Sequence, residues 1–188
     1  SVVSETFPHL KRGAIRDFAI ALGDHYDPRC WNKSESTYNL PNGSVIDFFS
    51  ADAPSKVHGP ARDHLFLNEV QNISYEIARQ LFVRTRGKIV LDYNPNFRFW
   101  AHDEIIPRDD REFICLKYTD NEALGDAERD EILNYYRQGY DEDGNVKNPF
   151  WANVWRVYGL GEVGVLVGTI FTKVKSGDFP DDLPYVYG

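Results

Sequence analysis

The pair Asn68-Glu69 is the part of the sequence that points most directly to chemistry, because it follows a short apolar run at residues 64–67. A run of this length is typical of a strand buried on both faces of a parallel sheet. Ligands of open α/β sheets bind at the carboxyl ends of such strands. In phosphate-loop nucleotide sites, the first residue at this position holds the Mg²⁺ shell, and the second orients or deprotonates the attacking water. Many buried strands are followed by a single acid, so the pair alone does not decide between a nucleotide site and a structural strand end.

A second polar position, Asn94, follows the next predicted strand at residues 88–92. The carboxyl ends of neighbouring parallel strands lie at one edge of a sheet, so we expect Asn94 near Glu69. Pro95 fixes the backbone just beyond Asn94 and disfavours helical geometry there. An amide held in this way is able to contact a γ-phosphate or the attacking water. Residues 93–96 also favour turns, but their occurrence one strand after the first pair favours the site.

Short strands and helices must position these residues. Residues 1–4 are predicted to form the end of a strand, and residues 8–22 a helix that Gly23 ends. Residues 36–40 and 44–49 are predicted to form a β-hairpin around the turn Pro41-Asn42-Gly43.

The two candidate site segments are predicted to belong to one βαβ unit. Ser74 is the predicted N-cap of a helix that Gly87 ends. The strand at 64–67, this helix and the strand at 88–92 then form a right-handed crossover. The fold class expected from these elements is α/β.

Composition limits the classes of protein to consider. A chain of 188 residues with 42% hydrophobic residues is sufficient for one globular domain and a tail. No apolar run approaches the roughly 20 residues of a membrane span. The net charge of −8 argues against a clamp on duplex DNA, which needs a basic surface. Cys30 and Cys115 match no metal spacing, so we expect reduced thiols in a cytosolic compartment.

The sequence contains no methionine, and Ser1-Val2-Val3 has the pattern of an interrupted strand. We therefore expect an internal piece of a longer chain.

Segments along nearly the whole chain resemble, in order, the ATPase domain of the large terminase subunit of tailed phages and prophages. The most diagnostic are the pair Asn68-Glu69, YNPN at residues 93–96 and GLGEVG at residues 159–164. The resemblance implies a partial P-loop NTPase core of the ASCE type, with a mainly parallel sheet flanked by helices and a β-hairpin insertion. It assigns residues 1–160 to the C-terminal portion of the ATPase domain and residues 161–188 to a linker into a nuclease domain. The matching segments are VVSETFPHLKRGAIRDF, NGSVIDFFSAD, KVHGPARDHLFLNEVQNIS, IVLDYNPN and WRVYGLGEVGVLVG.

The resemblance also implies roles for individual residues. Glu69 falls on the catalytic base, and Asn68 on the Walker B acid that organises Mg²⁺, here through water. Tyr93, Asn94 and Pro95 fall on the motif that couples the nucleotide state to DNA movement. The implied cofactors are ATP and Mg²⁺. The implied partners are double-stranded viral DNA, the portal protein, the terminase small subunit and further copies in a ring on the prohead, in the cytoplasm of a bacterial host.

The sequence departs from the family pattern at three points. Asn68 is neutral where many members have Asp, although an amide is able to hold the waters that Mg²⁺ keeps. No residue matches the arginine finger cleanly, and Arg62 is the nearest choice. No G-x-x-x-x-G-K-[ST] loop occurs in residues 1–188. Since that loop cradles the phosphates, we predict that this chain alone neither binds ATP tightly nor hydrolyses it.

The remaining segments are less specific. Residues 111–118 and 169–171 are predicted strands, and residues 126–137 and 149–158 are predicted helices. Two other readings stay open: another P-loop ATPase of a helicase-like kind, and a non-catalytic α/β binding or assembly domain.

Overall fold

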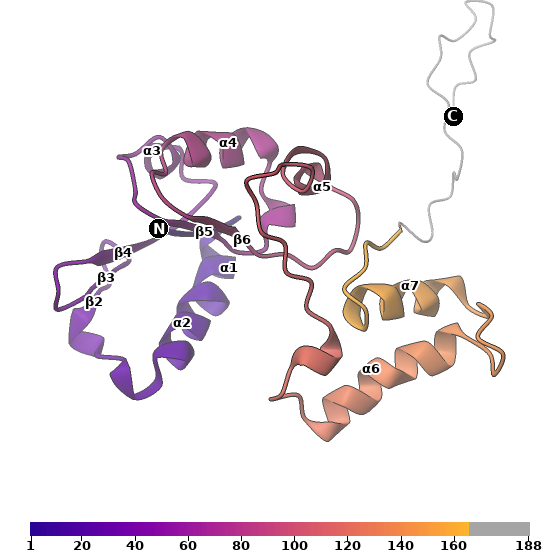
Figure 1. Cartoon of the computed structure of the whole chain (residues 1–188). Helices are drawn as coiled ribbons and strands as arrows, with labels where there is room; N and C mark the ends of the chain where they lie inside the picture. The colour runs from indigo at the N-terminus through magenta and orange to yellow at the C-terminus, as the bar shows by residue number, and fades with distance from the viewer. Residues whose placement is uncertain (166–188) are drawn as a thin grey trace, which may run out of the picture.

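The computed structural model describes residues 1–165. They form a six-stranded sheet in the order β2-β3-β4-β1-β5-β6 (Figure 1). β4, β1, β5 and β6 are parallel to one another, whereas β2, β3 and β4 pair antiparallel. The predicted α/β class, with a mainly parallel sheet and a β-hairpin, is confirmed. The strands are β1 (Val2–Ser4), β2 (Trp31–Asn32), β3 (Thr37–Asn39), β4 (Val45–Ser50), β5 (Leu65–Leu67) and β6 (Ile89–Leu91).

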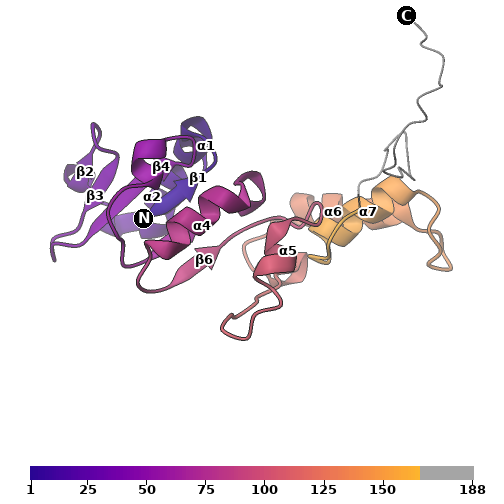
Figure 2. The ribbon, with the colours of Figure 1, turned by 90° about the horizontal axis from the view of Figure 1, so that it is seen from above.

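Helices lie on both faces of the sheet. α1 and α2 lie below it in Figure 1, and α3 and α4 lie above it. The α6–α7 pair lies beyond the β6 side of the sheet in both views (Figures 1 and 2). The helices are α1 (Phe7–Arg12), α2 (Ala14–Leu22), α3 (Pro54–Val57), α4 (Tyr75–Val83), α5 (Trp100–Glu104), α6 (Asp126–Gly139) and α7 (Pro149–Tyr158). None of the helices in the described part of the chain is long and apolar enough to cross a membrane.

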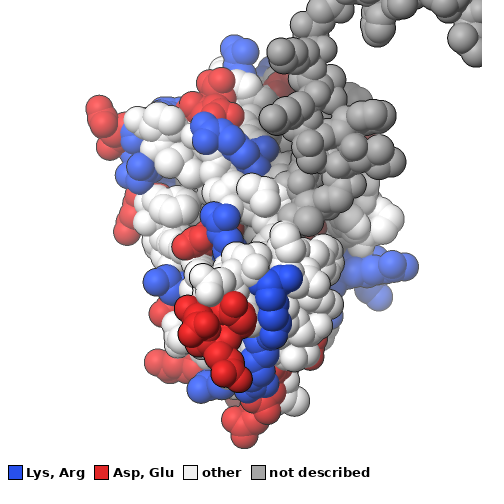
Figure 3. Space-filling model, turned by 90° about the vertical axis from the view of Figure 1, so that its right-hand side faces the viewer, with Lys and Arg blue, Asp and Glu red and all other residues white. Residues whose placement is uncertain are grey.

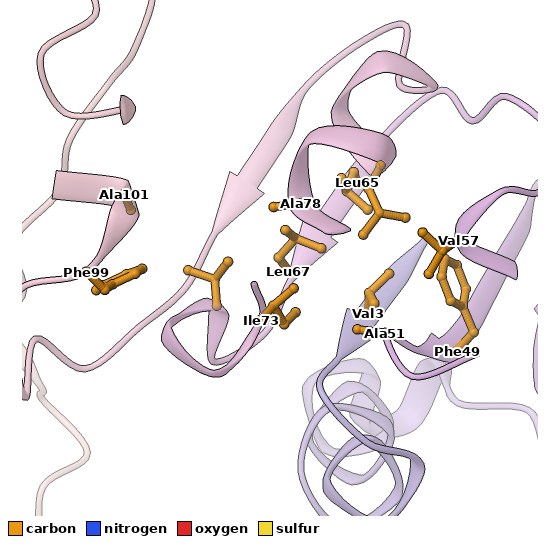
Figure 4. Close-up of a cluster of buried hydrophobic side chains, with 12 residues drawn as sticks. Val3, Phe49, Ala51, Val57, Leu65, Leu67, Ile73, Ala78, Phe99 and Ala101 are labelled. Atoms are coloured by element: carbon orange, nitrogen blue, oxygen red, sulfur yellow. The ribbon is translucent and has the colours of Figure 1, made fainter. Parts of the chain in front are cut away.

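The alternation of side chains along the strands divides the core into two clusters. Val3 is fully buried on the α4 side, with Leu65 and Leu67 of β5 and Ala78 of α4 (Figure 4). Phe48 belongs to a second cluster, on the opposite face of the sheet, because successive residues of a strand point to opposite faces. Its buried neighbours are Leu10, Ala14 and Tyr38. The sheet is therefore held between two apolar layers, which fixes the positions of its strand ends.

The helix predicted over residues 8–22 is two helices, and this expectation was wrong in one respect. The chain breaks at Gly13, which has φ −99° and ψ −98° and separates α1 from α2. A Cβ atom at Gly13 would lie 3.1 Å from the His9 carbonyl oxygen and 4.0 Å from Asn68 Nδ2. The break therefore brings the backbone close to the end of β5. The predicted stop at Gly23 is confirmed, with φ +50°.

The helix between β5 and β6 begins where the sequence predicted and ends earlier than predicted. Ser74 is the N-cap of α4, and its side chain accepts a hydrogen bond from the Ile77 N–H. The helix ends at Val83, before Gly87, so Gly87 is not its stop. Gly87 is instead a point of close approach, because a Cβ there would lie 2.6 Å from the Asp63 carbonyl oxygen.

β5 and β6 were both predicted to be buried, but they differ in how far they are exposed. Leu65 and Leu67 of β5 are 2% and 0% exposed, whereas Ile89 and Val90 of β6 are 39% and 50% exposed. β6 is the last strand in the order of the described sheet, so one of its sides has no neighbour there. The expectation of full burial was wrong for β6.

Later segments follow the predictions in part. The helices expected over residues 126–137 and 149–158 are α6 and α7. The strand expected over residues 111–118 is absent from the described structure, where residues 111–117 have no regular secondary structure. Its apolar alternation finds no neighbouring strand, and Ile114 and Leu116 are exposed. The expected strand at 169–171 lies outside the described residues, and the domain boundary at residue 160 stays a prediction.

Candidate functional site

Four polar residues stand in one row across the carboxyl end of the parallel sheet: Ser50, Ser4, Asn68 and Asp92. Ser4 pairs in register with Ser50. The neighbouring pairs Val3–Leu67 and Leu67–Leu91 bring Asn68 beside Ser4 and Asp92 beside Asn68. Residues in register on parallel strands project from the same face. Asn68 Nδ2 accordingly donates a hydrogen bond of 3.3 Å to Ser4 Oγ.

Burial changes along this row. Ser4 and Ser50 are 1% and 6% exposed, Asn68 is half-buried, and Asp92 is exposed. The row is thus closed toward β4 and open toward β6. A ligand is able to reach it from the β6 side.

Glu69 stands directly after Asn68 in a left-handed backbone conformation, with φ 53° and ψ 50°. This region is rare for a residue that is neither Gly, Asn nor Asp. In a regular parallel ladder the Asp92 carbonyl would accept the Glu69 N–H, but here it accepts the Val70 N–H at 2.8 Å. The chain therefore bulges at Glu69, and Asn72 Nδ2 lies 3.5 Å from Glu69 Oε2. Backbone strain of this kind persists where the surroundings impose it, and it gathers at functional sites.

Asp92 is the site residue that sequence reasoning did not single out. Partial burial raises the pKa of its carboxyl, and the charge of Glu69 raises it further, while the Glu69 backbone N–H opposes both by hydrogen bonding to the carboxylate. The signal in the sequence is its position, because Asp92 directly follows β6 as Asn68 directly follows β5. Asn94, the residue predicted from the sequence, lies two positions further along the chain.

Replacing Asp92 by Asn is expected to stabilise the metal-free fold at neutral pH. The folded state holds the pKa of Asp92 above its ordinary value of 3.8, so the ionised carboxylate lowers the free energy of unfolding. This loss begins as the pH rises above 3.8 and is complete once the pH has passed the raised pKa, and it is absent well below 3.8, where the carboxyl is neutral in both states. Thermal unfolding in EDTA at about pH 7 and about pH 3 measures the effect. Asp63→Asn, at the other end of β5, is the control, and an equal gain at both pH values for Asp92→Asn would contradict the prediction.

Tyr93, Asn94 and Pro95 lie just beyond β6. The buried Tyr93 hydroxyl oxygen has no hydrogen-bond partner among residues 1–165, and burial raises the pKa of this hydroxyl, with a smaller contribution from Cys115. Asn94 is exposed, and its carbonyl oxygen accepts the Asn96 N–H at 2.8 Å. Within residues 1–165, no hydrogen bond joins Asn94 to Glu69. Asp92 is the residue from this strand end that neighbours Glu69.

The YNPN loop contacts the distant GLGEVG segment. The Gly164 N–H donates a hydrogen bond of 2.8 Å to the Pro95 carbonyl oxygen. A Cβ at Gly164 would lie 2.5 Å from the Asn96 carbonyl oxygen, so only a residue without a side chain fits here. The loop at the sheet edge is thereby joined to the chain that leaves α7.

Gly164→Ala is expected to lower the free energy of unfolding by about 1–3 kcal/mol, because the added methyl group displaces the backbone around Asn96. Chemical denaturation followed by circular dichroism measures this. Gly125→Ala is the matched control, since a Cβ there would meet only Glu128 Oε2, at 3.5 Å. Equal losses for the two variants would show that the close approach at Gly164 is not the cause.

Arg62 lies at the opposite, amino end of β5, inside the fold. It is 9% exposed, and its guanidinium carbon lies 5.5 Å from the centre of the Phe49 ring. Its Nε and Nη1 atoms have no hydrogen-bond partner in the part of the chain that the structure describes, and burial lowers the pKa of the guanidinium. An arginine finger is supplied either within one subunit or by a neighbouring subunit, and it must reach the phosphates. Arg62 is buried at the opposite end of β5 from Asn68 and Glu69, and its role as the finger stays a prediction.

The row fits Mg²⁺ in the chemistry of its donors. Asn68, Ser4 and Asp92 offer the oxygen ligands that Mg²⁺ prefers, and Mg²⁺ commonly keeps several waters and takes its remaining ligands from phosphates. Among residues 1–165, no group of three or more His, Cys, Asp or Glu side chains is arranged to hold a metal ion. The strand ends would therefore hold the ion in part through water.

The fold is similar to that of a large terminase from a thermophilic bacteriophage. One crystal form of that terminase matches with a TM-score of 0.62 at 16% sequence identity, over 87% of this chain and 39% of that chain. A second crystal form, in complex with ADP, matches with a TM-score of 0.59 at 18% identity, over 85% of this chain and 39% of that chain. No family model matches the sequence, and no curated protein matches it significantly. The structural likeness confirms the α/β fold of the terminase ATPase domain that the resemblance implied.

Proposed function

We propose that this chain is a fragment of the ATPase domain of a large terminase, the ATP-hydrolysing motor subunit that packages viral double-stranded DNA. The observation that carries the proposal is Glu69, which the left-handed bulge presents at the carboxyl end of β5 beside Asn68 and Asp92. A carboxylate held at this point of a parallel sheet is placed to act on a water at a bound nucleotide. The complex of the similar bacteriophage terminase with ADP supports an adenine nucleotide as the ligand.

Each residue of the site has a separate task in this proposal. Glu69 orients the attacking water and accepts its proton. Asn68 holds the Mg²⁺ hydration shell, with its side chain fixed by Ser4 at 3.3 Å. Asn68, with Asp92 beside it, would hold Mg²⁺ here, and the ion would supply positive charge to offset the charge that develops on the phosphates.

Tyr93, Asn94 and Pro95 form the coupling segment in this proposal. A conformational change at the sheet edge would be transmitted to the segment just after α7, because the Pro95 carbonyl oxygen accepts a hydrogen bond from the Gly164 N–H there. Movement of the loop would therefore displace the chain that follows α7, and with it the α6–α7 pair.

The partners follow from the motor function and are part of the proposal. They are double-stranded viral DNA, the portal protein, the terminase small subunit and further copies in a ring on the prohead, in the cytoplasm of a bacterial host. On the face in Figure 3, Lys and Arg side chains are interspersed with Asp and Glu side chains. The net charge of −8 also argues against DNA binding by this chain alone. We therefore propose that DNA is bound by the assembled ring and not by this chain alone.

The test is ATP turnover by the complete product of the gene. We expect Mg²⁺-dependent hydrolysis that double-stranded DNA stimulates, and no turnover by residues 1–188 alone, because they contain no phosphate loop. A complete gene product that neither hydrolyses ATP nor binds ADP would overturn the proposal in favour of a non-catalytic α/β domain. Turnover that DNA leaves unchanged would favour another P-loop ATPase.

A further inference from the structure

We infer that Asp92 supplies the anionic oxygen that the neutral Asn68 lacks at the Mg²⁺ site. The inference rests on the proposed function and deepens it. It assigns the metal site to two neighbouring strand ends, an amide on one and a carboxylate on the other.

The orientation of Asn68 is the first step. Its Nδ2 donates to Ser4 Oγ on the β1 side, at 3.3 Å. This bond uses the amide nitrogen, so the acceptor oxygen Oδ1 is not engaged by Ser4. The strand on the other side of β5 is β6, which Asp92 follows directly. Asn68 therefore has an amide oxygen available at a strand end whose neighbour carries a carboxylate.

The rigidity of Asp92 is the second step. Its N–H donates to the Leu67 carbonyl at 3.0 Å, and its own carbonyl accepts the Val70 N–H at 2.8 Å. Both bonds fix Asp92 beside Asn68 at the end of the ladder. The residue as a whole is exposed although its carboxyl group is partly buried, so a metal ion that keeps several waters is able to approach it from the exposed side.

Charge is the third step. Mg²⁺ sites in nucleotide-binding proteins commonly use one or two carboxylates together with the phosphates. Asp92 is the only charged member of the row formed by Ser50, Ser4, Asn68 and Asp92. The bulge places Glu69 outside the ladder, near Asn72 Nδ2. In the proposed site Glu69 therefore acts on the attacking water and is not a ligand of the ion.

The Glu69 N–H also lies toward the Asp92 carboxylate. This contact occupies only part of the group, because an ionised carboxylate has two oxygens and about four acceptor sites. Asp92 is thus able to support the Glu69 bulge and still hold the ion. If Asp92 had only a structural role, its replacement would leave metal affinity unchanged, whereas a ligand role predicts a loss of metal affinity.

The experiment measures Mn²⁺, used in place of Mg²⁺, on the complete gene product with saturating ADP. Free Mn²⁺ is read from its electron paramagnetic resonance signal. Asp92→Asn is expected to weaken Mn²⁺ binding at least about tenfold, while ADP affinity in EDTA is unchanged. The double variant Asn68→Asp/Asp92→Asn, which moves the carboxylate to the neighbouring strand, is expected to recover the lost affinity.

Asp63→Asn is the matched control, because it removes the same charge at the opposite end of β5 and is expected to leave Mn²⁺ binding unchanged. Unchanged Mn²⁺ affinity in Asp92→Asn, or no recovery in the double variant, would overturn the inference while ADP binding upholds the proposed function. A comparable loss in Asp63→Asn would also overturn it, since overall charge would then be the cause. Absence of ADP binding by the unaltered protein would overturn the proposed function, and the inference with it.

Discussion

Replacing Glu69 by Gln is expected to reduce the Mg²⁺-dependent ATP turnover of the complete gene product by about 10²–10⁴-fold, the usual contribution of a general base. Gln has nearly the same shape as Glu, so the left-handed bulge and the Asn72 contact are retained in kind. The amide is unable to accept the proton of the attacking water. The loss is therefore expected in kcat, with nucleotide affinity little changed.

Glu76→Gln provides the comparison, because Glu76 is an exposed acid in the first turn of α4 and makes the same change of charge. Turnover and ADP binding are measured on both variants. If Glu69→Gln hydrolysed ATP as fast as Glu76→Gln, Glu69 would not be the base. If it lost ADP binding as well, the residue would act in binding the nucleotide and not in activating the water.

Replacing Phe48 by Ala is expected to lower the free energy of unfolding by about 3–5 kcal/mol. Phe48 is 1% exposed, and its ring centre lies 5.3 Å from those of both Phe18 and Trp31. Truncation leaves a cavity between β4 and α2 in addition to the lost burial. Since whole domains are stable by only about 5–15 kcal/mol, the variant is expected to be close to unfolding.

Val45→Ala is the control on the same strand, because Val45 is 56% exposed and lies outside the core. Denaturation curves in urea compare the two variants, with an expected change of about 0.5 kcal/mol or less for Val45→Ala. A loss below about 1 kcal/mol for Phe48→Ala would contradict the packing of this cluster. The experiment thereby tests whether the β-hairpin is part of the same folded unit as the parallel sheet.

Local patterns in the sequence were sufficient for most of the elements. The run before Asn68, the N-cap at Ser74 and the turn at residues 41–43 each depend on neighbours within a few positions, and the structure has the corresponding strand, helix and hairpin. The likeness to a terminase also followed from short ordered segments, and the fold agrees with it. The roles of Glu69, Asn68 and Asn94 stay predictions.

Contacts between distant segments were beyond the reach of such patterns. Alternation of apolar residues predicted a strand at 111–118, but a strand forms only when another chain segment offers it hydrogen bonds. The same reason explains why β6 is exposed although its sequence is as apolar as that of β5. Burial of Arg62 against Phe49 likewise depends on where β4 lies.

The sequence by itself determined most of the strands and helices and the presence of polar residues after two of the strands. Only the tertiary structure decided which of those polar residues meet. It aligned Ser4, Asn68 and Asp92 by the register of three strands, and it brought Asp92 beside Glu69, whereas the expected proximity of Asn94 to Glu69 stays a prediction. Register is set by hydrogen bonds between segments far apart in the chain. No local propensity contains that information, so the neighbours of Glu69 appear only once the strands are paired.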